Sequence, residues 1–352
     1  MAETNTPETA QRHRRATIAD VAAAAGVSRS AVSKVFNGNG HISKATTERI
    51  RAAAAELGWS PSSSAVALRS ARTNAIGLVV YRSRDVIAIP PMSSAVIAGI
   101  EAVLSPLDLG LLLYLRDRNQ EDELAFYRRL TSSRRVDGMI LTDSVVDDRR
   151  FEMLEQARMP TVLLGTPAAP IPFRHVDVDP PGAGMDAAVA HLIRHGHIHI
   201  AYVGGDETRV AAHIRRQAFD ESVAQHDGIV GTVTVTSYSP DEAAQETLRL
   251  LRSPDRPTAV VYASDPMAMA GMRAAKLDGF RVPEDVSIVG FDGLPMGEWV
   301  EPQLSTVKRD GVMRGRAVAW EILDVLGMAP GERPELHAPE LVIRGSTARA
   351  PK

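Results

Sequence analysis

TIADVAAAAGVSRSAVSKVFNG, residues 17–38, decides how the start of this chain folds. Thr17 is a helix-capping residue, and Asp20 follows in the first turn, where a carboxylate meets the positive end of the helix dipole. Gly26 ends this helix in the left-handed conformation that glycine adopts most easily, and Ser28 begins a second helix two residues later. Two short helices joined by so tight a turn predict a helix-turn-helix.

A third helix is predicted from Ser43, through KATTERIRAAAAEL, to a stop at Gly58. The three helices share a core because their apolar residues recur at helical spacing. We expect this core to contain Val21, Ala22, Ala25, Val32, Val35, Phe36, Ile50, Ala53, Ala54 and Leu57.

The second predicted helix has a polar face that combines cationic, hydroxyl and amide side chains. Its members are Arg29, Ser30, Ser33, Lys34 and Asn37. Such a mixture suits base edges and phosphates in a major groove. A solvated polar face on an ordinary small bundle is the alternative interpretation.

Charge is divided unevenly along the 352 residues, a length that suggests two or three folded units. Residues 1–73 hold ten basic and five acidic side chains, a net charge of +5, whereas the other 279 residues have a net charge of −8. The whole-chain value of −3 conceals this division. A cationic head before an anionic body is typical of nucleic-acid binding.

Several classes of protein are excluded or disfavoured by composition. The chain has no cysteine, which excludes disulfide scaffolds, cysteine-ligated zinc and thiol catalysis. MAETNTPETAQRHRR, residues 1–15, lacks the apolar stretch of a signal peptide, and no segment approaches the ~18 uncharged apolar residues of a membrane span. We therefore expect a cytoplasmic, nucleoid-associated protein with no membrane partner.

Residues 17–38, together with HISKATTERIRAAAAELGWSPSSSAVALRSARTNAIGLVV at 41–80, resemble the start of the LacI/GalR family of bacterial transcription regulators, almost without gaps. The resemblance implies that the second helix reads bases of an operator through Arg29, Ser30 and Lys34. It also implies DNA-backbone contacts from Ile18, Ser33, Asn37, His41, Ser43 and Thr46.

The segment SSSAVALRS after Pro61 resembles the family's hinge, a short helix that orders on DNA. Leu68 is the implied minor-groove wedge, with Ala65 on the same side. Ser62 stands where the family commonly has Asn, which weakens the case for that phosphate contact. Without the preceding motif, the stretch would be interpreted as a Ser-rich linker.

From residue 76 onward, short apolar runs alternate with segments of helical spacing. The runs are IGLVV, LGLLLYL, DGMILT and PTVLLG, and later HIAYVGG, GTVTVTS, TAVVYASD and VSIVGFD. This rhythm predicts βαβ units with parallel sheets buried on both faces, arranged in two α/β lobes.

The body also carries family-like stretches: GHIHIAYVGG, VVYASDPMAMAGMRAA, VPEDVSIVGFDG, PQLSTVKRD and APELVIRGST. The implied fold is of the periplasmic-binding-protein type, two doubly wound lobes between which the chain crosses near 173, 304 and 335. The expected divisions are a disordered basic tail (1–16), the all-α helix-turn-helix head (17–61), a hinge (62–73), a first lobe (74–173 with 304–334) and a second lobe (174–303 with 335–349).

Ligands of doubly wound sheets bind beyond the carboxyl ends of the strands, which favours the residues after VVYA and VSIVGF. The resemblance implies effector contacts from Arg215, or Arg216 if the register slips by one, and from Asp292, which could otherwise cap the next segment. Tyr238 is an aromatic wall of the site, or a core residue. Further implied contacts are Tyr81, Arg118, Thr142 or Asp143, and the pair Ser264 and Asp265, where the family has Asn-Asp. Gly165 stands where the lactose repressor has an acid, so the effector need not be a galactoside.

HLIRHGHIHI places His191 and His195 at the i, i+4 spacing of a helical zinc pair. Gly196 interrupts the helix, His197 and His199 approach a strand, and carboxylate or cysteine neighbours are missing from the motif. We expect no metal and no cofactor.

The sequence therefore favours a DNA-binding regulator, most simply a repressor, that binds a pseudo-palindromic operator as a homodimer and responds to a small, carbohydrate-like effector. RGSTARAPK, after Ile343, is short and polar and lacks a leucine heptad, which favours a dimer over a tetramer. An enzyme is disfavoured because no catalytic triad elbow, P-loop or dinucleotide fingerprint is found. A solute-binding protein would leave the basic head without a purpose.

Overall fold

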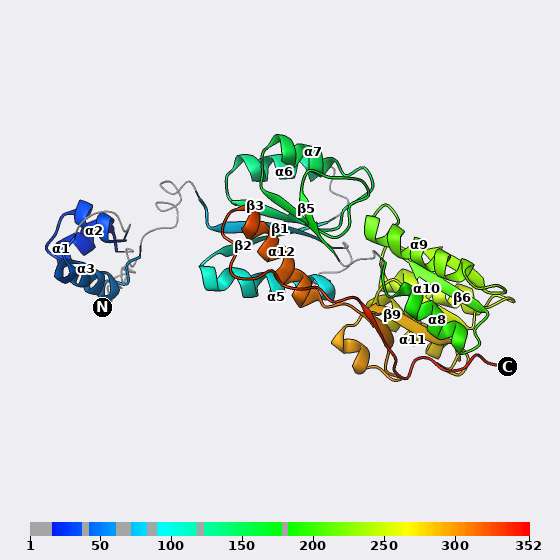
Figure 1. The fold of residues 1–352 in the computed structure, drawn as a ribbon. Coiled ribbons are helices and arrows are strands. Elements are labelled where there is room, and N and C mark those ends of the chain that lie inside the picture. Colours follow the sequence, from blue (N-terminus) through cyan, green and yellow to red (C-terminus); the bar gives the residue numbers. More distant parts are fainter. Residues whose placement is uncertain (1–15, 37–41, 61–71, 83–89, 118–122, 178–181) are drawn as a thin grey trace, which may run out of the picture. The chain divides into compact units, whose positions relative to one another are not determined.

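The structure, a computed structural model, describes residues 16–36, 42–60, 72–82, 90–117, 123–177 and 182–352. It divides at residue 73 into a small first unit and a large second unit, each of which is drawn in Figure 1. Among the helices of these ranges, none combines the length and apolar character needed to cross a bilayer.

The first unit confirms the three predicted helices. They are α1 (Ile18–Ala24), α2 (Arg29–Phe36) and α3 (Lys44–Glu56). Val21, Val32 and Ile50, one from each helix, are fully buried together. Phe36 and Trp59 close the edge of this core with their rings edge to face, 5.1 Å apart.

The predicted helix ends are also in place. Ser28 Oγ accepts a hydrogen bond from the backbone N–H of Ala31 at 3.1 Å. The Asp20 carboxylate accepts from the Thr17 N–H at 2.8 Å. Gly26 has φ +61°, so its left-handed conformation makes the tight turn between α1 and α2.

The first lobe of the second unit is a parallel sheet in the order β2-β1-β3-β4-β5. Its strands are β1 (Ala75–Arg82), β2 (Gly110–Asp117), β3 (Gly138–Leu141), β4 (Thr161–Leu164) and β5 (Arg174–Val176). Its helices are α5 (Pro91–Leu104), η1 (Ser105–Leu107), α6 (Glu123–Ser132), α7 (Arg149–Gln156) and α12 (Gly311–Val325). One core lies between the sheet and α5 with α12, and another lies on the opposite face under α6 and α7 (Figure 1).

Two glycines let α12 pack directly against α5. A Cβ at Gly99 would lie 2.0 Å from the carbonyl oxygen of Val312, and a Cβ at Gly315 would lie 2.1 Å from that of Val96. Helix α12, which comes late in the sequence, therefore packs in the first lobe with its backbone in contact with that of α5.

The second lobe is a sheet in the order β11-β10-β9-β8-β6-β7, parallel except for β11. Its strands are β6 (His199–Gly204), β7 (Val230–Val235), β8 (Ala259–Tyr262), β9 (Ser287–Asp292), β10 (Ser305–Lys308) and β11 (Glu340–Val342). Its helices are α8 (Met185–Arg194), α9 (Val210–Ala224), α10 (Pro240–Leu251), α11 (Asp265–Leu277) and η2 (Pro295–Glu298). Helix α8 packs beside α9, and α10 beside α11, which confirms the doubly wound prediction.

Two of the three expected crossings lie later than predicted. β5 pairs with β4 through Val162 and Arg174, so the chain leaves the first lobe only after 176. β10 pairs with β9 through Val289 and Ser305, so the chain leaves the second lobe only after 308. Both boundary strands are short, and their sequence does not distinguish a last strand from the start of a linker.

Candidate functional site

The second helix of the head presents a cationic, hydroxyl-bearing surface. Arg29, Ser30 and Lys34 are exposed on α2, whereas Val32 faces the core. Within Arg29–Phe36, the first turn holds no acidic residue, so the positive end of the helix dipole adds to the charge of Arg29. This surface can donate hydrogen bonds to base edges and to phosphate oxygens.

Two of the residues expected to contact the DNA backbone, Ile18 and Ser43, lie at the starts of α1 and α3. Ser43 is exposed and caps α3, with its hydroxyl 2.8 Å from that of Thr46, while Ile18 and Ser33 are partly buried. Five predicted residues lie outside the described residues: Asn37, His41, Ala65, Leu68 and Arg118.

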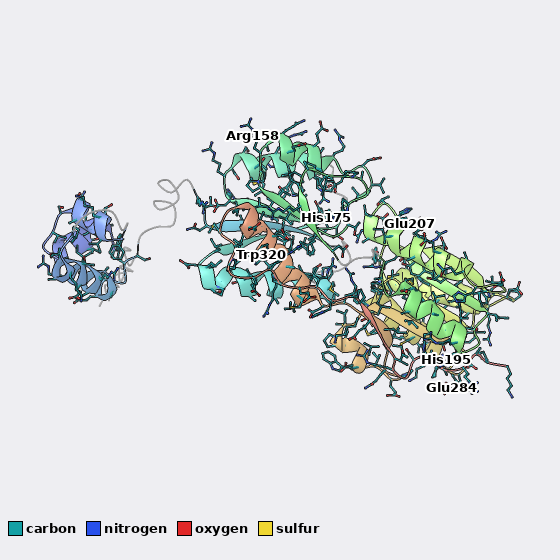
Figure 2. All side chains as sticks on the ribbon, viewed as in Figure 1. Arg158, His175, His195, Glu207, Glu284 and Trp320 are labelled. Atoms are coloured by element: carbon teal, nitrogen blue, oxygen red, sulfur yellow. The ribbon has the colours of Figure 1, made fainter. Side chains whose placement is uncertain are left out.

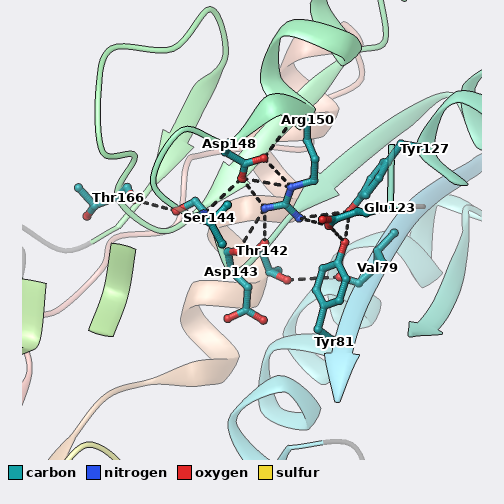
Figure 3. A network of polar contacts seen from close by, with 11 residues as sticks. Val79, Tyr81, Glu123, Tyr127, Thr142, Asp143, Ser144, Asp148, Arg150 and Thr166 are labelled. Carbon is teal, nitrogen blue, oxygen red and sulfur yellow. Dashed lines mark hydrogen bonds and ion pairs between the residues drawn. The ribbon is translucent and has the colours of Figure 1, made fainter. Parts of the chain in front are cut away.

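Tyr81, expected at the effector, belongs instead to a buried polar network of the first lobe (Figure 3). Its hydroxyl donates to the Glu123 carboxylate and lies 3.3 Å from the Tyr127 hydroxyl. Burial raises the pKa of Tyr81, so its proton stays available as a donor. The Arg150 guanidinium, 3% exposed, pairs with Asp148 at 2.6 Å beside these rings.

The Arg150 network fixes the loop after β3, where the lobes touch. Arg150 Nη2 donates to the carbonyls of Thr142 and Asp143, each at 3.2 Å. The Thr142 hydroxyl donates to the Val79 carbonyl of the same lobe at 3.3 Å. Of the two alternatives, Thr142 and Asp143, Asp143 is therefore the one that faces the other lobe. Its carboxylate lies 3.9 Å from Arg209 Nη1.

Backbone hydrogen bonds join the lobes at the same place. The N–H of Val146 donates to the Thr208 carbonyl, and that of Val210 to the Ser144 carbonyl, both at 3.0 Å. These bonds form an antiparallel bridge between Val145 and Arg209. Because α9 begins at Val210, a movement of residues 144–146 in the first lobe would displace the start of α9.

A cavity lies between the lobes, with about 390 Å³ of empty space including its open side. It is lined by Thr166, Asp177, Gly182, Ala183, Ala211, Ile214, Arg215, Phe291, Arg309 and Pro339. The lining residues come from both lobes: Thr166, Asp177 and Arg309 follow β4, β5 and β10, Phe291 lies near the end of β9, and Ala211, Ile214 and Arg215 lie in α9. Of the two strand ends that the sequence favoured, the described lining therefore includes the end of VSIVGF but nothing after VVYA.

Arg215 is the predicted residue that lines the cavity. Its guanidinium carbon lies 4.4 Å from the centre of the Phe291 ring, and Nη1 donates to the Tyr238 hydroxyl and the Ala263 carbonyl, each at 3.3 Å. Arg216, the alternative, pairs with Asp220 at 2.6 Å on the helix surface and is absent from the described cavity lining.

Arg216 also contacts Glu207, which lies by the start of α9 (Figure 2), at 2.9 Å. Tyr238 packs its ring on Gly205, where a Cβ would come within 2.0 Å of it, and against the core of the second lobe. Its hydroxyl accepts from Arg215, and Tyr238 is absent from the described cavity lining, which favours the core interpretation of this aromatic.

Asp292 ends β9 beside the cavity. Its carboxylate lies 3.8 Å from Arg309 Nη1. Burial raises the pKa of Asp292 to about 6, although the charges of Arg215 and Arg309 oppose this. The pKa of this carboxyl group therefore lies close to neutral pH, although the guanidinium groups of Arg215 and Arg309 are nearby.

Asp265, predicted at the effector, has a structural role. It is fully buried, and its carboxylate accepts from the Thr306 hydroxyl and the Leu294 N–H, each at 2.6 Å. These bonds connect the start of α11 to the turn after β9 and to β10. Asp265 is absent from the described cavity lining. Ser264, the residue before α11, is half-buried and does not line the cavity in the described part of the chain.

The residues missed by sequence reasoning are Asp177, Thr166, Arg309 and Arg314. The Asp177 carboxylate accepts from Arg314 and from the Thr166 hydroxyl, the latter at 2.9 Å. Arg314 and Arg309 hold the pKa of Asp177 below its ordinary value, although burial alone would raise it. Asp177 and Arg309 each directly follow a strand, a position that could have identified them.

Two histidines of the HLIRHGHIHI stretch, His191 and His197, contact residues 347 and 348 near the C-terminus. His191 Nε2 lies 3.0 Å from the Thr347 hydroxyl, and His197 lies 2.9 Å from the Thr258 hydroxyl and 3.1 Å from the Ala348 carbonyl. Burial lowers the pKa of His191 to about 4, which keeps it neutral at pH 7. These side chains have a structural task.

Comparison with known proteins finds a matching family model for each of the two units. Residues 17–62 match the model of bacterial regulatory proteins of the lacI family, and residues 189–347 match that of the periplasmic binding protein-like domain. The HTH-type transcriptional regulator CelR of Thermobifida fusca is 33% identical over 89% of this chain and 93% of its own length.

Two solved structures extend the likeness. A transcriptional regulator CelR–cellobiose complex is 31% identical, covers 94% of this chain and all of its own, and has a TM-score of 0.67. A lac repressor dimer bound to operator and the anti-inducer ONPF is 26% identical, covers 95% of this chain and all of its own, and has a TM-score of 0.80. The chain belongs to the lacI family of bacterial regulatory proteins.

Proposed function

We propose that this chain is a sequence-specific transcriptional repressor that binds a pseudo-palindromic operator as a homodimer and is controlled by a small, sugar-like effector in the cavity. Arg29, Ser30 and Lys34 read base edges in the major groove. Backbone contacts come from Ile18, Ser33, Asn37, His41, Ser43 and Thr46, and Ala65 with Leu68 enters the minor groove. The observation that carries the proposal is the exposure of the three base-reading side chains on α2 of a lacI-type head.

The two relatives with bound molecules support these partners. One was solved as a complex with cellobiose and the other as a dimer on operator DNA. In this chain, Trp299 is 79% exposed and Leu277 is 72% exposed on the second lobe. A second copy could cover these large apolar side chains.

Effector binding acts through the lobes. Because the cavity is lined from both lobes, a ligand that contacts both favours their closed arrangement and shifts a two-state equilibrium. The contacts of residues 144–146 with 208–210 repack in that shift, and the first lobe passes the change to the hinge and the head.

Selection of duplexes from a random pool by the full chain tests this proposal. We expect enrichment of a two-fold symmetric site with half-sites about one helical turn, or a multiple of it, apart, because each copy reads one half. Recovery of unrelated duplexes with equal affinity would reject it.

A further inference from the structure

Two guanidinium groups of the cavity lie on the same aromatic ring. The guanidinium carbons of Arg215 and Arg309 are 4.4 Å and 5.7 Å from the centre of the Phe291 ring. Both side chains line the cavity, and the Arg309 side chain is 15% exposed. Both guanidinium groups therefore border the same cavity, with the Phe291 ring of β9 as a shared contact.

The donors of these groups are largely unused. The Arg309 guanidinium makes no hydrogen bond to any described residue, and its ion pair with Asp292 spans 3.8 Å. Arg215 uses Nη1 alone, for the neutral Tyr238 hydroxyl and Ala263 carbonyl. A guanidinium carries five N–H donors, so several remain for a ligand.

The nearby carboxylates accept no hydrogen bond from the Arg215 or Arg309 guanidinium groups in the described part of the chain. Asp177 is engaged by Arg314 and by the Thr166 hydroxyl. Asp265 accepts from Thr306 and Leu294 behind the cavity wall. Among the described carboxylates at the cavity, Asp177 and Asp292 therefore face three guanidinium groups, those of Arg215, Arg309 and Arg314. Burial and the proximity of Arg314 and Arg215 lower the pKa of Arg309, a sign of incompletely balanced positive charge.

We infer that the effector of this cavity carries an oxyanion, a carboxylate or a phosphate ester on a hydroxylated carbon skeleton, bound by Arg215 and Arg309. The inference rests on the proposed function and narrows the class of its effector. A planar guanidinium pairs with a carboxylate or phosphate through two parallel N–H bonds, whereas a neutral sugar leaves the excess of three guanidinium groups over two carboxylates unbalanced. Asp292 accepts hydroxyl donors of the same ligand.

Calorimetry and thermal unfolding of the full chain test this with matched ligand pairs. The pairs are gluconate against glucitol, glucose 6-phosphate against glucose, and inorganic phosphate against chloride at equal ionic strength. We expect at least one oxyanion to bind about tenfold or more tightly than its neutral partner, as a hydrogen bond to a charged group implies. The first two pairs distinguish a carboxylate from a phosphate ester.

Substitutions at Arg309 separate charge from structure. Arg309→Gln keeps amide donors and should reduce oxyanion binding about tenfold. Arg309→Lys should retain the preference for the oxyanion, and Arg316→Gln, which removes an exposed charge on α12, should change nothing.

Equal binding of the neutral partner, unchanged oxyanion binding in Arg309→Gln, or no binding of any oxyanion would each overturn the inference. None of these outcomes affects operator selection by the head, so failure of this inference is distinguishable from failure of the proposed function.

Discussion

Asp292 and Arg309 lie 3.8 Å apart just beyond the parallel strands β9 and β10, with the Phe291 ring beside them. The register of the two strands, in which Asp292 pairs with Lys308, sets this relationship. An acid and a base from neighbouring strand ends thus meet at the cavity, and both are buried enough for their charges to interact strongly.

The raised pKa of Asp292 makes stability depend on pH. A carboxyl group with a folded pKa of about 6 and an ordinary value of 3.8 stabilises the fold below pH 4 and loses that contribution as pH rises to 6. Asp292→Asn should therefore gain stability relative to the unmodified chain as pH rises from 4 to 7, by up to roughly 3 kcal/mol. Parallel denaturant titrations of both proteins at each pH measure this. A constant difference between them would contradict the prediction.

Arg215→Gln should weaken effector binding about tenfold or more, because it removes a charged donor from the cavity wall. Arg216→Gln is the matched control, since Arg216 pairs with Asp220 and Glu207 outside the cavity. Calorimetry with the compound that most stabilises the unmodified chain provides the readout. Equal losses in the two variants would argue against the assignment of Arg215.

Lys34→Ala should relax specificity at one base pair of each half-site, at a loss of ~1 to 3 kcal/mol of discrimination. Arg51→Ala, which removes an exposed charge from α3, should at most weaken binding to all sequences alike. Sequencing of selected duplexes distinguishes the two. Unchanged preference at every position in Lys34→Ala would remove Lys34 from base readout.

Gly99→Ala should destabilise the second unit by at least about 2 kcal/mol, because its Cβ would lie 2.0 Å from the Val312 carbonyl oxygen. Gly110→Ala is the control, since the nearest atom to its Cβ, the Asn74 carbonyl oxygen, is 3.8 Å away. Chemical denaturation compares them. Equal stability of both variants would mean that α5 and α12 separate without cost.

Trp299→Arg should shift the chain from dimer to monomer, because it replaces a large exposed aromatic side chain of the second lobe by a charge. Gln225→Arg, which adds the same charge at an exposed polar site after α9, serves as the control. Sedimentation velocity measures both. A Trp299→Arg variant that remains as dimeric as the control would place the interface elsewhere.

The helices of the head could be predicted closely because local signals define them. Thr17, Gly26, Ser28 and Ser43 mark helix ends through short-range hydrogen bonds and dihedral preference. The alternation of apolar runs likewise predicted both sheets. The ends of the lobes were less predictable, because β5 and β10 are only three and four residues long and lack a long apolar run.

The site was predicted in part. The structure places Arg215, within α9, in the cavity lining and Asp292 at the end of β9. Asp265 has the right sequence position but binds the turn after β9, and Tyr81 binds Glu123. Which way a buried polar side chain points depends on partners from other elements, and no single stretch of sequence carries that information.

The affinity ratio between a selected operator and a scrambled duplex of equal length tests sequence-specific operator binding most directly. Fluorescence anisotropy of the full chain at several salt concentrations measures this ratio. We predict a ratio of ~10³ or more near physiological salt, with affinity that falls steeply as salt rises. A ratio close to one at every salt concentration would contradict sequence-specific binding.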